Sequence, residues 1–311
     1  MKTRIITGII FTIAVAGFVL PGYIIPQLPL MFFFIVAAIC IIEVSTIVKI
    51  KLNHLNQALC VIGSLAVFTP LVSVLLHGDL GWRMISDYSI AEPNRLIVER
   101  SILLRYVTES ITFLFVFLVV FAYVSIFYMI ISKGPTVLLD SFSMSIVVVY
   151  VVIPVACGLI LLYSIPNGFL WMLAAMITAW VSDVFAYFAG VTLGKHKIVP
   201  LISPKKTWEG SIGGILGSMF IMTIWFSLIM NRPDIVEKTI VYRISFGVVI
   251  GLLSSAFSQF GDWFASSIKR WTGSKDFGKF LPGHGGLMDR FDGVFFTFPI
   301  MLIGAMFYYL V

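Results

Sequence analysis

Charged residues are scarce in this chain of 311 residues. Asp, Glu, Lys and Arg together make up 12% of it, whereas a soluble domain carries about 25%. Apolar residues make up 59%, and the mean hydropathy is +1.04. So much apolar surface cannot be covered by the polar residues of the chain itself, so lipid must cover it. The composition therefore excludes a soluble globular protein and intrinsic disorder, and it indicates an integral membrane protein.

Cysteine is also scarce, with residues at positions 40, 60 and 157 alone. Each stands singly in an apolar stretch, without the CxxC spacing of a zinc ribbon or a redox motif. This pattern excludes a disulfide framework and a thiolate metal centre. We expect all three side chains to be buried packing residues.

Long runs without charge indicate where the chain crosses the membrane. A helix needs about 20 apolar residues to span about 30 Å of hydrocarbon. Two runs are long enough for two helices each, with breaks at the prolines of 21–29 and at 166–168, and five are long enough for one. These runs are 5–42, 141–182, 52–78, 110–132, 210–231, 244–261 and 293–311. The sequence therefore predicts an all-α polytopic membrane protein with about nine transmembrane helices.

The basic residues are unevenly divided between the two sides of such a bundle. Fourteen of the 21 fall on the side of the N-terminus, which the positive-inside rule makes the cytoplasm. The C-terminus is then extracytoplasmic. The first run, with Ala14-Val15-Ala16, also resembles a signal peptide, but we expect it to be retained as a span. The fourteen residues are Lys2, Arg4, Lys49, Lys51, Lys133, Lys195, Lys197, Lys205, Lys206, Lys269, Arg270, Lys275, Lys279 and Arg290.

The polar motifs divide the chain into two regions. Residues 1–140 hold N-terminal transmembrane helices and an extracytoplasmic segment, 78–109, whose role the sequence does not indicate. Residues 141–311 hold the remaining helices and three polar clusters, which converge on the cytoplasmic side. We expect this second region to be catalytic.

The first cluster is a single carboxylate, Asp183, inside the predicted sixth span. An aspartate at the centre of a membrane helix costs about 2.5 to 3.5 kcal/mol on insertion scales. It therefore needs a cation partner or a wet cavity, which favours a role in binding substrate. The alternative is a hydrogen bond that only packs two helices together.

The second cluster is the basic loop, which we define as residues 194–207. It ends in Ser203-Pro204-Lys205-Lys206-Thr207, directly before the predicted seventh span. Lysines, hydroxyls and the N–H groups at the start of a helix attract phosphate. The glycines of a Walker A loop are absent. Ordinary positive charge beside the membrane is the alternative interpretation.

The third cluster is the signature segment, residues 261–292. Asp289 and Asp292 are three residues apart, so on a helix they share a face and could hold one hard cation. Glycines at 283, 285 and 286 allow close approach of a bulky anion. His284 has no second His or Cys at ligand spacing, which favours a role other than zinc binding. The other charged residues of the segment are Asp262, Lys269, Arg270, Lys275, Asp276, Lys279 and Arg290.

The signature segment resembles a known family. The pattern is Ser266-x-Ile268-Lys269-Arg270, then Lys275-Asp276-x-Gly278-x-x-Leu281-Pro282-x-His284-Gly285-Gly286-Leu287-x-Asp289-Arg290-Phe291-Asp292. It is similar to the signature of the phosphatidate cytidylyltransferases, also called CDP-diacylglycerol synthases, without departure from 266 to 292. The segments around Asp183, the basic loop and Gly261-Asp262 also resemble that family. The resemblance covers about the C-terminal 40% of the chain.

The resemblance implies an enzyme of phospholipid biosynthesis in the bacterial inner membrane, with its active site facing the cytoplasm. CTP and phosphatidic acid would give CDP-diacylglycerol and pyrophosphate. The resemblance implies Mg²⁺, held by Asp262, Asp289 and Asp292, and a second cation such as K⁺ that the spacing does not place. Membrane lipids are implied partners, a homodimer is left open, and no nucleic acid is implied. The other implied catalytic residues are Lys275, Asp276 and Arg290, and the implied substrate-binding residues are Asp183, Ser203, Lys205, Lys206, Thr207, Lys269, Arg270, His284, Gly285 and Gly286.

Two other functions remain open. A CTP-dependent polyprenol or phytol kinase would also need a nucleotide site and access to lipid, but the full signature favours the cytidylyltransferase. An anion transporter could use a buried aspartate and a basic mouth. Transport would predict charges spread over several spans, whereas here they gather at one side of the membrane.

Overall fold

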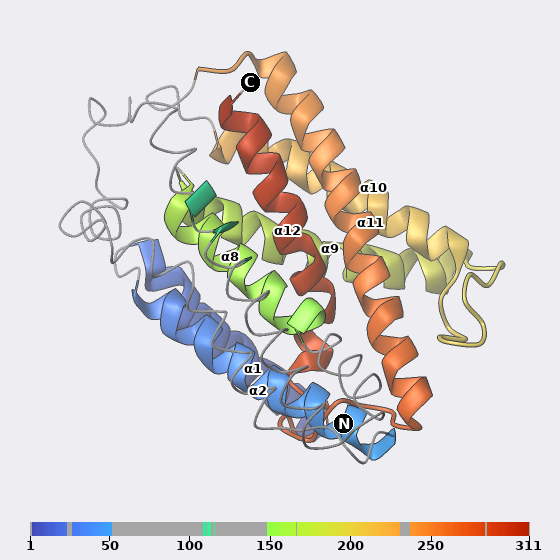
Figure 1. Ribbon diagram of the computed structural model, residues 1–311. Helices are drawn as coiled ribbons and strands as arrows, with labels where there is room; N and C mark the ends of the chain where they lie inside the picture. The colour runs from blue at the N-terminus through green and yellow to red at the C-terminus, as the bar shows by residue number, and fades with distance from the viewer. Residues whose placement is uncertain are drawn as a thin grey trace.

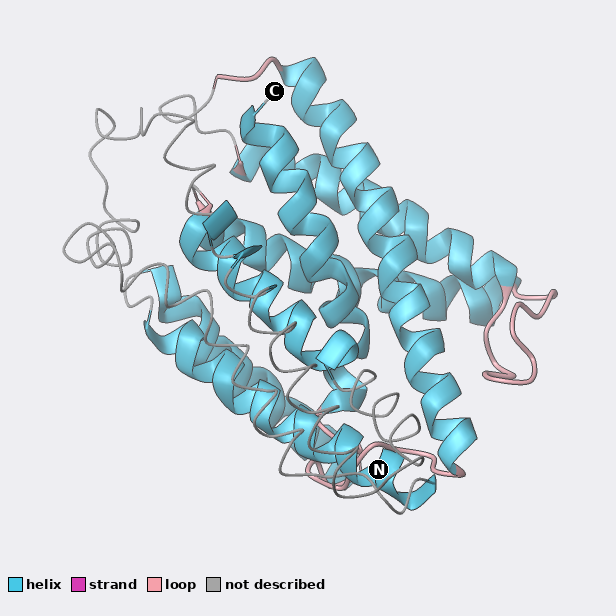
Figure 2. Cartoon of the chain, viewed as in Figure 1, coloured by secondary structure: helices cyan, strands magenta, loops and turns pink. Residues whose placement is uncertain are grey.

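The computed structural model describes residues 2–23, 27–51, 108–109, 111–112, 115, 148–165, 167–230, 237–283 and 285–310. Within these ranges every regular element is a helix and no strand is formed (Figure 2). The predicted all-α class is confirmed for them. The elements are α1 (Lys2–Val19), the 3₁₀ turn η1 (Leu20–Tyr23), α2 (Gln27–Lys51), the π turn η5 (Val148–Val152), α8 (Ile153–Ser164), α9 (Gly168–Leu193), α10 (Trp208–Ile224), the π turn η6 (Trp225–Ile229), α11 (Ile240–Thr272) and α12 (Met288–Leu310).

Five of the described helices are long and apolar enough to cross a membrane. They cover Met31–Val48, Gly168–Leu193, Trp208–Ile229, Ile240–Thr272 and Met288–Tyr309. Two shorter apolar helices cover Ile6–Gly22 and Tyr150–Leu162. The predicted span at 52–78, nearly all of that at 110–132 and most of segment 78–109 lie outside the described residues. The total of nine spans and the sides of the two termini therefore stay predictions.

The break predicted within 141–182 is confirmed. Asn167 adopts the left-handed conformation, with φ of 53°, between the end of α8 and the start of α9. The Gly168 Cα lies so close to the carbonyl of Leu162 that a Cβ would not fit. The chain therefore reverses here, and α9 then runs to Leu193, well beyond the end of the predicted span.

Helix α11 is longer than the run that predicts it. The charge-free run ends at Gly261, but the helix continues to Thr272, where Gly273 closes it with φ of 74°. Its 33 residues correspond to about 50 Å at 1.5 Å per residue, more than the hydrocarbon thickness of about 30 Å. The first part of the signature segment is thus helical and places Asp262 and Lys269 on one continuous element.

The helices pack closely around the region that carries the signature. Helix α12 lies between α8 and α11 and also contacts α9 (Figure 1). Helices α9 and α10 approach through glycines, and a Cβ at Gly214 would come within 2.8 Å of the Ser182 carbonyl oxygen. Such small-residue contacts are typical of helix pairs in membranes. Helix α2, from the first predicted region, packs against α11 and α12 of the second.

Candidate active site

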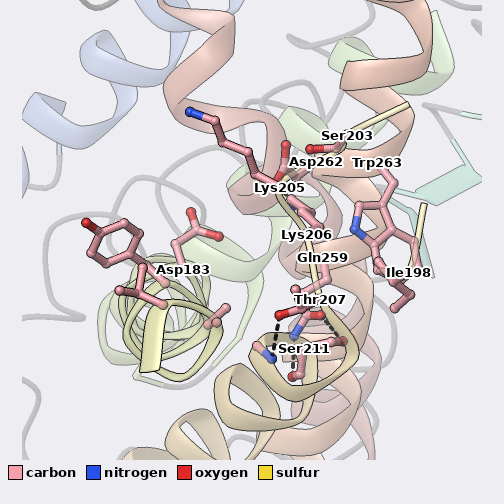
Figure 3. A pocket seen from close by; sticks show the side chains of 15 residues that line it. Asp183, Ile198, Ser203, Lys205, Lys206, Thr207, Ser211, Gln259, Asp262 and Trp263 are labelled. Atoms are coloured by element: carbon pink, nitrogen blue, oxygen red, sulfur yellow. Dashed lines mark hydrogen bonds and ion pairs between the residues drawn. The ribbon is translucent and has the colours of Figure 1, made fainter. Parts of the chain in front are cut away.

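A pocket of about 390 Å³ lies where α9, the basic loop, α10 and α11 meet. Figure 3 shows Asp183 on one side of it and Lys206 and Asp262 on the other. Ser203, Lys205, Thr207, Gln259 and Trp263 also line the pocket. The Asp183 side chain is exposed to this space, which favours the predicted wet cavity over a hydrogen bond that only packs helices. The structure therefore brings the first two polar clusters together.

Lys206 and Asp262 form an ion pair on the side of the pocket opposite Asp183. Their side chains are 29% and 27% exposed. Burial lowers the pKa of the Lys206 ammonium from its usual value, and the negative charges of Asp183 and Asp292 oppose that shift. One ammonium from the basic loop thus lies in the field of carboxylates from α9, α11 and α12.

Asp289 is held from three directions. Lys269 Nζ lies 2.6 Å from its Oδ1, and the two side chains are 13% and 7% exposed. The backbone N–H groups of Phe277 and Gly286 donate to its Oδ2 at 2.8 and 2.9 Å. Lys269 Nζ also lies over the Phe277 ring, 5.2 Å from its centroid. Asp289 therefore binds α11 and the signature segment to the start of α12.

The first turn of α12 carries the two aspartates that end the signature segment. It begins at Met288 and places Asp289 and Asp292 three residues apart on one helix. The Asp292 Oδ1 accepts the N–H of Gly293 at 2.8 Å. Arg290 is exposed in the same turn, and Lys275 and Asp276 are exposed in the signature segment. His284 lies outside the described residues.

Three predicted substrate-binding residues also have structural contacts. Thr207 caps α10, and its Oγ1 accepts the N–H of Gly210 at 3.2 Å. Arg270 Nε donates to the carbonyl of Ile202 at 3.2 Å, which joins the last turn of α11 to the basic loop. Gly285 has φ of 88°, and a Cβ there would come within 3.0 Å of Asp289 Oδ2. The glycine at 285 therefore allows the segment to turn closely around this aspartate.

The three predicted metal ligands are carboxylates, which suit a hard cation, but in the structure they do not form a single cluster. Carboxylate oxygens are the ligands that Mg²⁺ prefers, and Asp262, Asp289 and Asp292 supply them from two adjacent helices. Among the residues that the structure describes, no three His, Cys, Asp or Glu side chains form a cluster that could hold a metal ion. Instead, Asp262 and Asp289 each pair with a lysine. A bound cation would have to share these carboxylates with Lys206 and Lys269 or replace them.

Sequence reasoning missed two polar residues that the structure places at the site. Gln259 lines the pocket, and its Nε2 donates to the Ser211 carbonyl at 3.1 Å. Glu43 of α2 accepts the backbone N–H groups of Leu287 and Met288. Each is a polar residue within or at the end of a charge-free run. That position could have singled out the residue, but it does not indicate which groups the residue contacts.

Comparisons with known proteins identify the family of the chain. The model of the cytidylyltransferase family matches residues 2–309. The chain belongs to the cytidylyltransferase family. A phosphatidate cytidylyltransferase of Staphylococcus saprophyticus is 33% identical over 189 residues, which is 60% of this chain and 67% of that protein. The protein of that name in Staphylococcus epidermidis is 36% identical over 190 residues, with the same shares. The one in Staphylococcus aureus strain COL is 33% identical over 189 residues, again with the same shares.

Proposed function

We propose that this membrane protein transfers the cytidylyl group of CTP to phosphatidic acid and so forms CDP-diacylglycerol and pyrophosphate. The observation that carries this proposal is a pocket between apolar helices that is lined by the Lys206–Asp262 pair, together with a second such pair, Lys269 and Asp289, on α11 and α12. Both pairs consist of residues from the motifs that resemble the phosphatidate cytidylyltransferases. The relatives that carry this name support the same substrates.

The reaction requires positioning and charge neutralisation more than proton transfer. A phosphate oxygen of phosphatidic acid attacks the α-phosphorus of CTP, and the bond from that phosphorus to the β-phosphate oxygen breaks. The nucleophile is already an oxyanion, so no protein base is needed. Lys205, Lys206, Lys275 and Arg290 would neutralise the lipid phosphate and the departing pyrophosphate. Ser203 and Thr207 stand at the pocket, where they would bind phosphate oxygens.

Asp262, Asp289 and Asp292 would hold Mg²⁺, whose charge would neutralise the triphosphate oxygens. In the structure Lys206 and Lys269 neutralise two of these carboxylates. If these carboxylates held a cation, Lys206 and Lys269 would be free to bind the phosphates. The chain therefore supplies both carboxylates that would bind the metal and ammonium groups that would bind the triphosphate.

The site lies at one end of the helices, which we propose to be the cytoplasmic surface of the bacterial inner membrane. The basic loop follows the span Gly168–Leu193 and precedes the span Trp208–Ile229. The signature segment connects the spans Ile240–Thr272 and Met288–Tyr309. Arg270 Nε contacts the Ile202 carbonyl, so both connections lie at the same end of the helices, as a single active site requires.

The deciding experiment follows the α-phosphorus of CTP. Protein purified in detergent is given Mg²⁺, phosphatidic acid and CTP labelled on the α-phosphorus. We expect the label in a CDP-lipid, release of pyrophosphate, and loss of both products with EDTA. A lipid kinase would attack the γ-phosphorus and leave the label in free CDP. Label in CDP would overturn the proposal in favour of the kinase, and anion flux into liposomes without either product would favour the transporter.

A further inference from the structure

Glu43 is a carboxylate within a candidate membrane span. It belongs to α2, inside the span Met31–Val48, and its side chain is 8% exposed. An acidic residue within a membrane helix is costly to bury, and such residues are by default functional. The mechanism above makes no use of this residue, so its position within a membrane span needs a separate explanation.

The partners of Glu43 are at the start of α12. Its Oε1 accepts the N–H of Leu287 at 3.0 Å, and its Oε2 accepts the N–H of Met288 at 2.8 Å. These N–H groups lack acceptors within the helix, because the first turn has no preceding turn to supply them. The positive end of the helix dipole adds to the attraction. Glu43 thus caps the helix that carries Asp289, although 244 and 245 residues separate it from its two partners.

Two glycines of the signature segment lie directly against this carboxylate. A Cβ at Gly286 would come within 2.5 Å of Glu43 Oε2, and a Cβ at Gly278 would overlap Oε1. Gly286 also donates its N–H to Asp289 Oδ2 at 2.9 Å. The segment is therefore held between two carboxylates, Glu43 on one side and Asp289 on the other.

We propose that Glu43 is a positioning residue for the transfer reaction. It fixes Gly278, Gly286 and the first turn of α12, and in this way it sets the direction of the Asp289 carboxylate. This inference rests on the proposed function. It also gives a physical reason for the glycines at 278 and 286, because any side chain there would displace the Glu43 carboxylate.

The first test measures kcat and KM in the Glu43→Gln protein. A glutamine can accept one of the two N–H groups, but its own NH₂ then faces the other. We expect kcat to fall about 10- to 100-fold, the range for groups that orient metal ligands, with the KM for CTP and for phosphatidic acid nearly unchanged. Glu43→Asp keeps the charge and should restore part of kcat. Gly278→Ala should reproduce the loss without changing any charge.

Ser45→Ala is the matched control. Ser45 lies on the same helix, is 4% exposed, and donates to the Ile42 carbonyl of its own helix at 3.1 Å. Its removal should leave kcat unchanged. If Ser45→Ala and Glu43→Gln lower kcat equally, packing of α2 explains the effect and the proposal fails. Unchanged kcat in Glu43→Gln would also overturn it.

The second test detects release of the segment without measuring turnover. Lys275 and Lys279 are exposed in the signature segment, and Lys195 and Lys197 are exposed in the basic loop. In the Glu43→Gln protein we expect trypsin to cleave faster in the signature segment, after Lys275 and Lys279. Cleavage in the basic loop should keep its wild-type rate. Equal acceleration at all four would indicate general unfolding and contradict the proposal. No acceleration at any site would contradict it as well.

The wild-type protein separates the two proposals. If it makes no CDP-lipid, the proposed function fails, and with it the claim that Glu43 serves this reaction. The cleavage ratio then still decides whether Glu43 holds the segment. If the wild type is active and the Glu43 variants behave like it in both assays, the proposed function stands and the inference about Glu43 fails.

Discussion

Lys206 and Asp262 are in direct contact although 56 residues separate them in the chain. The lysine is the residue before the last of the basic loop, and the aspartate lies on α11, ten residues before the end of the helix. Through this pair, the two polar connections between membrane helices become one site. Removing one partner leaves the other as an uncompensated, partly buried charge.

Lys206→Ala should lower kcat/KM for CTP by at least about 10-fold, because it removes a cation beside the triphosphate. Asp262→Ala should also lower it, and the loss in the double variant should be smaller than the product of the two single losses, since the residues act together. Lys197→Ala, in an exposed position of the same loop, is the control. The wild type, the two single variants and the double variant are compared. If the loss in the double variant equals the product of the two single losses, the ion pair has no role in turnover.

Asp289→Asn should abolish turnover while the protein remains folded and inserted. The amide has nearly the same shape, but it lacks the charge that Lys269 and a metal would bind, and we expect a loss of at least about 10²-fold in kcat. Glu237→Gln is a control at an exposed carboxylate before α11. Full activity of Asp289→Asn at ordinary Mg²⁺ concentrations would remove this residue from the metal site.

Thr207→Ala should lower the free energy of unfolding by about 1 kcal/mol, because the Gly210 N–H loses the acceptor that caps α10. Thr207→Ser keeps a hydroxyl and should stay close to wild type. Thr192→Ala is the comparison, since the Thr192 hydroxyl donates within α9 at 2.8 Å and is exposed. Thermal unfolding in one detergent measures all three. An equal loss for Thr192→Ala and Thr207→Ala would argue against a specific capping effect.

Cysteines introduced at positions 205 and 275 of a protein without its three native cysteines should react with a membrane-impermeant reagent from the cytoplasmic side. Both positions belong to connections that meet at the active site, so they must share one side. Whole cells and inverted vesicles give the two sides separately. Labelling of the two positions from opposite sides would contradict a single site.

The sequence predicts the local features of this protein better than its long-range contacts. Runs without charge locate the described membrane helices. The free-energy cost of exposing such an apolar run to water depends on the run itself and not on the helices that it packs against. The turn at Asn167 is likewise local. Helix α11 exceeds its run because helix formation continues past the apolar residues until Gly273 stops it. The partners of Glu43 could not be predicted, because nothing in one sequence indicates which distant N–H groups will meet a buried carboxylate.

The length of α11 bears on how a lipid substrate would reach the site. Asp262 lies about 33 Å from the start of the helix at 1.5 Å per residue, close to the full hydrocarbon thickness of about 30 Å. A site at this boundary would meet the phosphate of a lipid whose acyl chains stay among other acyl chains. Phosphatidic acid would therefore reach the site by lateral diffusion within one leaflet. The quantity that saturates the enzyme is then the mole fraction of substrate in the bilayer or micelle, and dilution with neutral lipid at constant bulk concentration should slow the reaction.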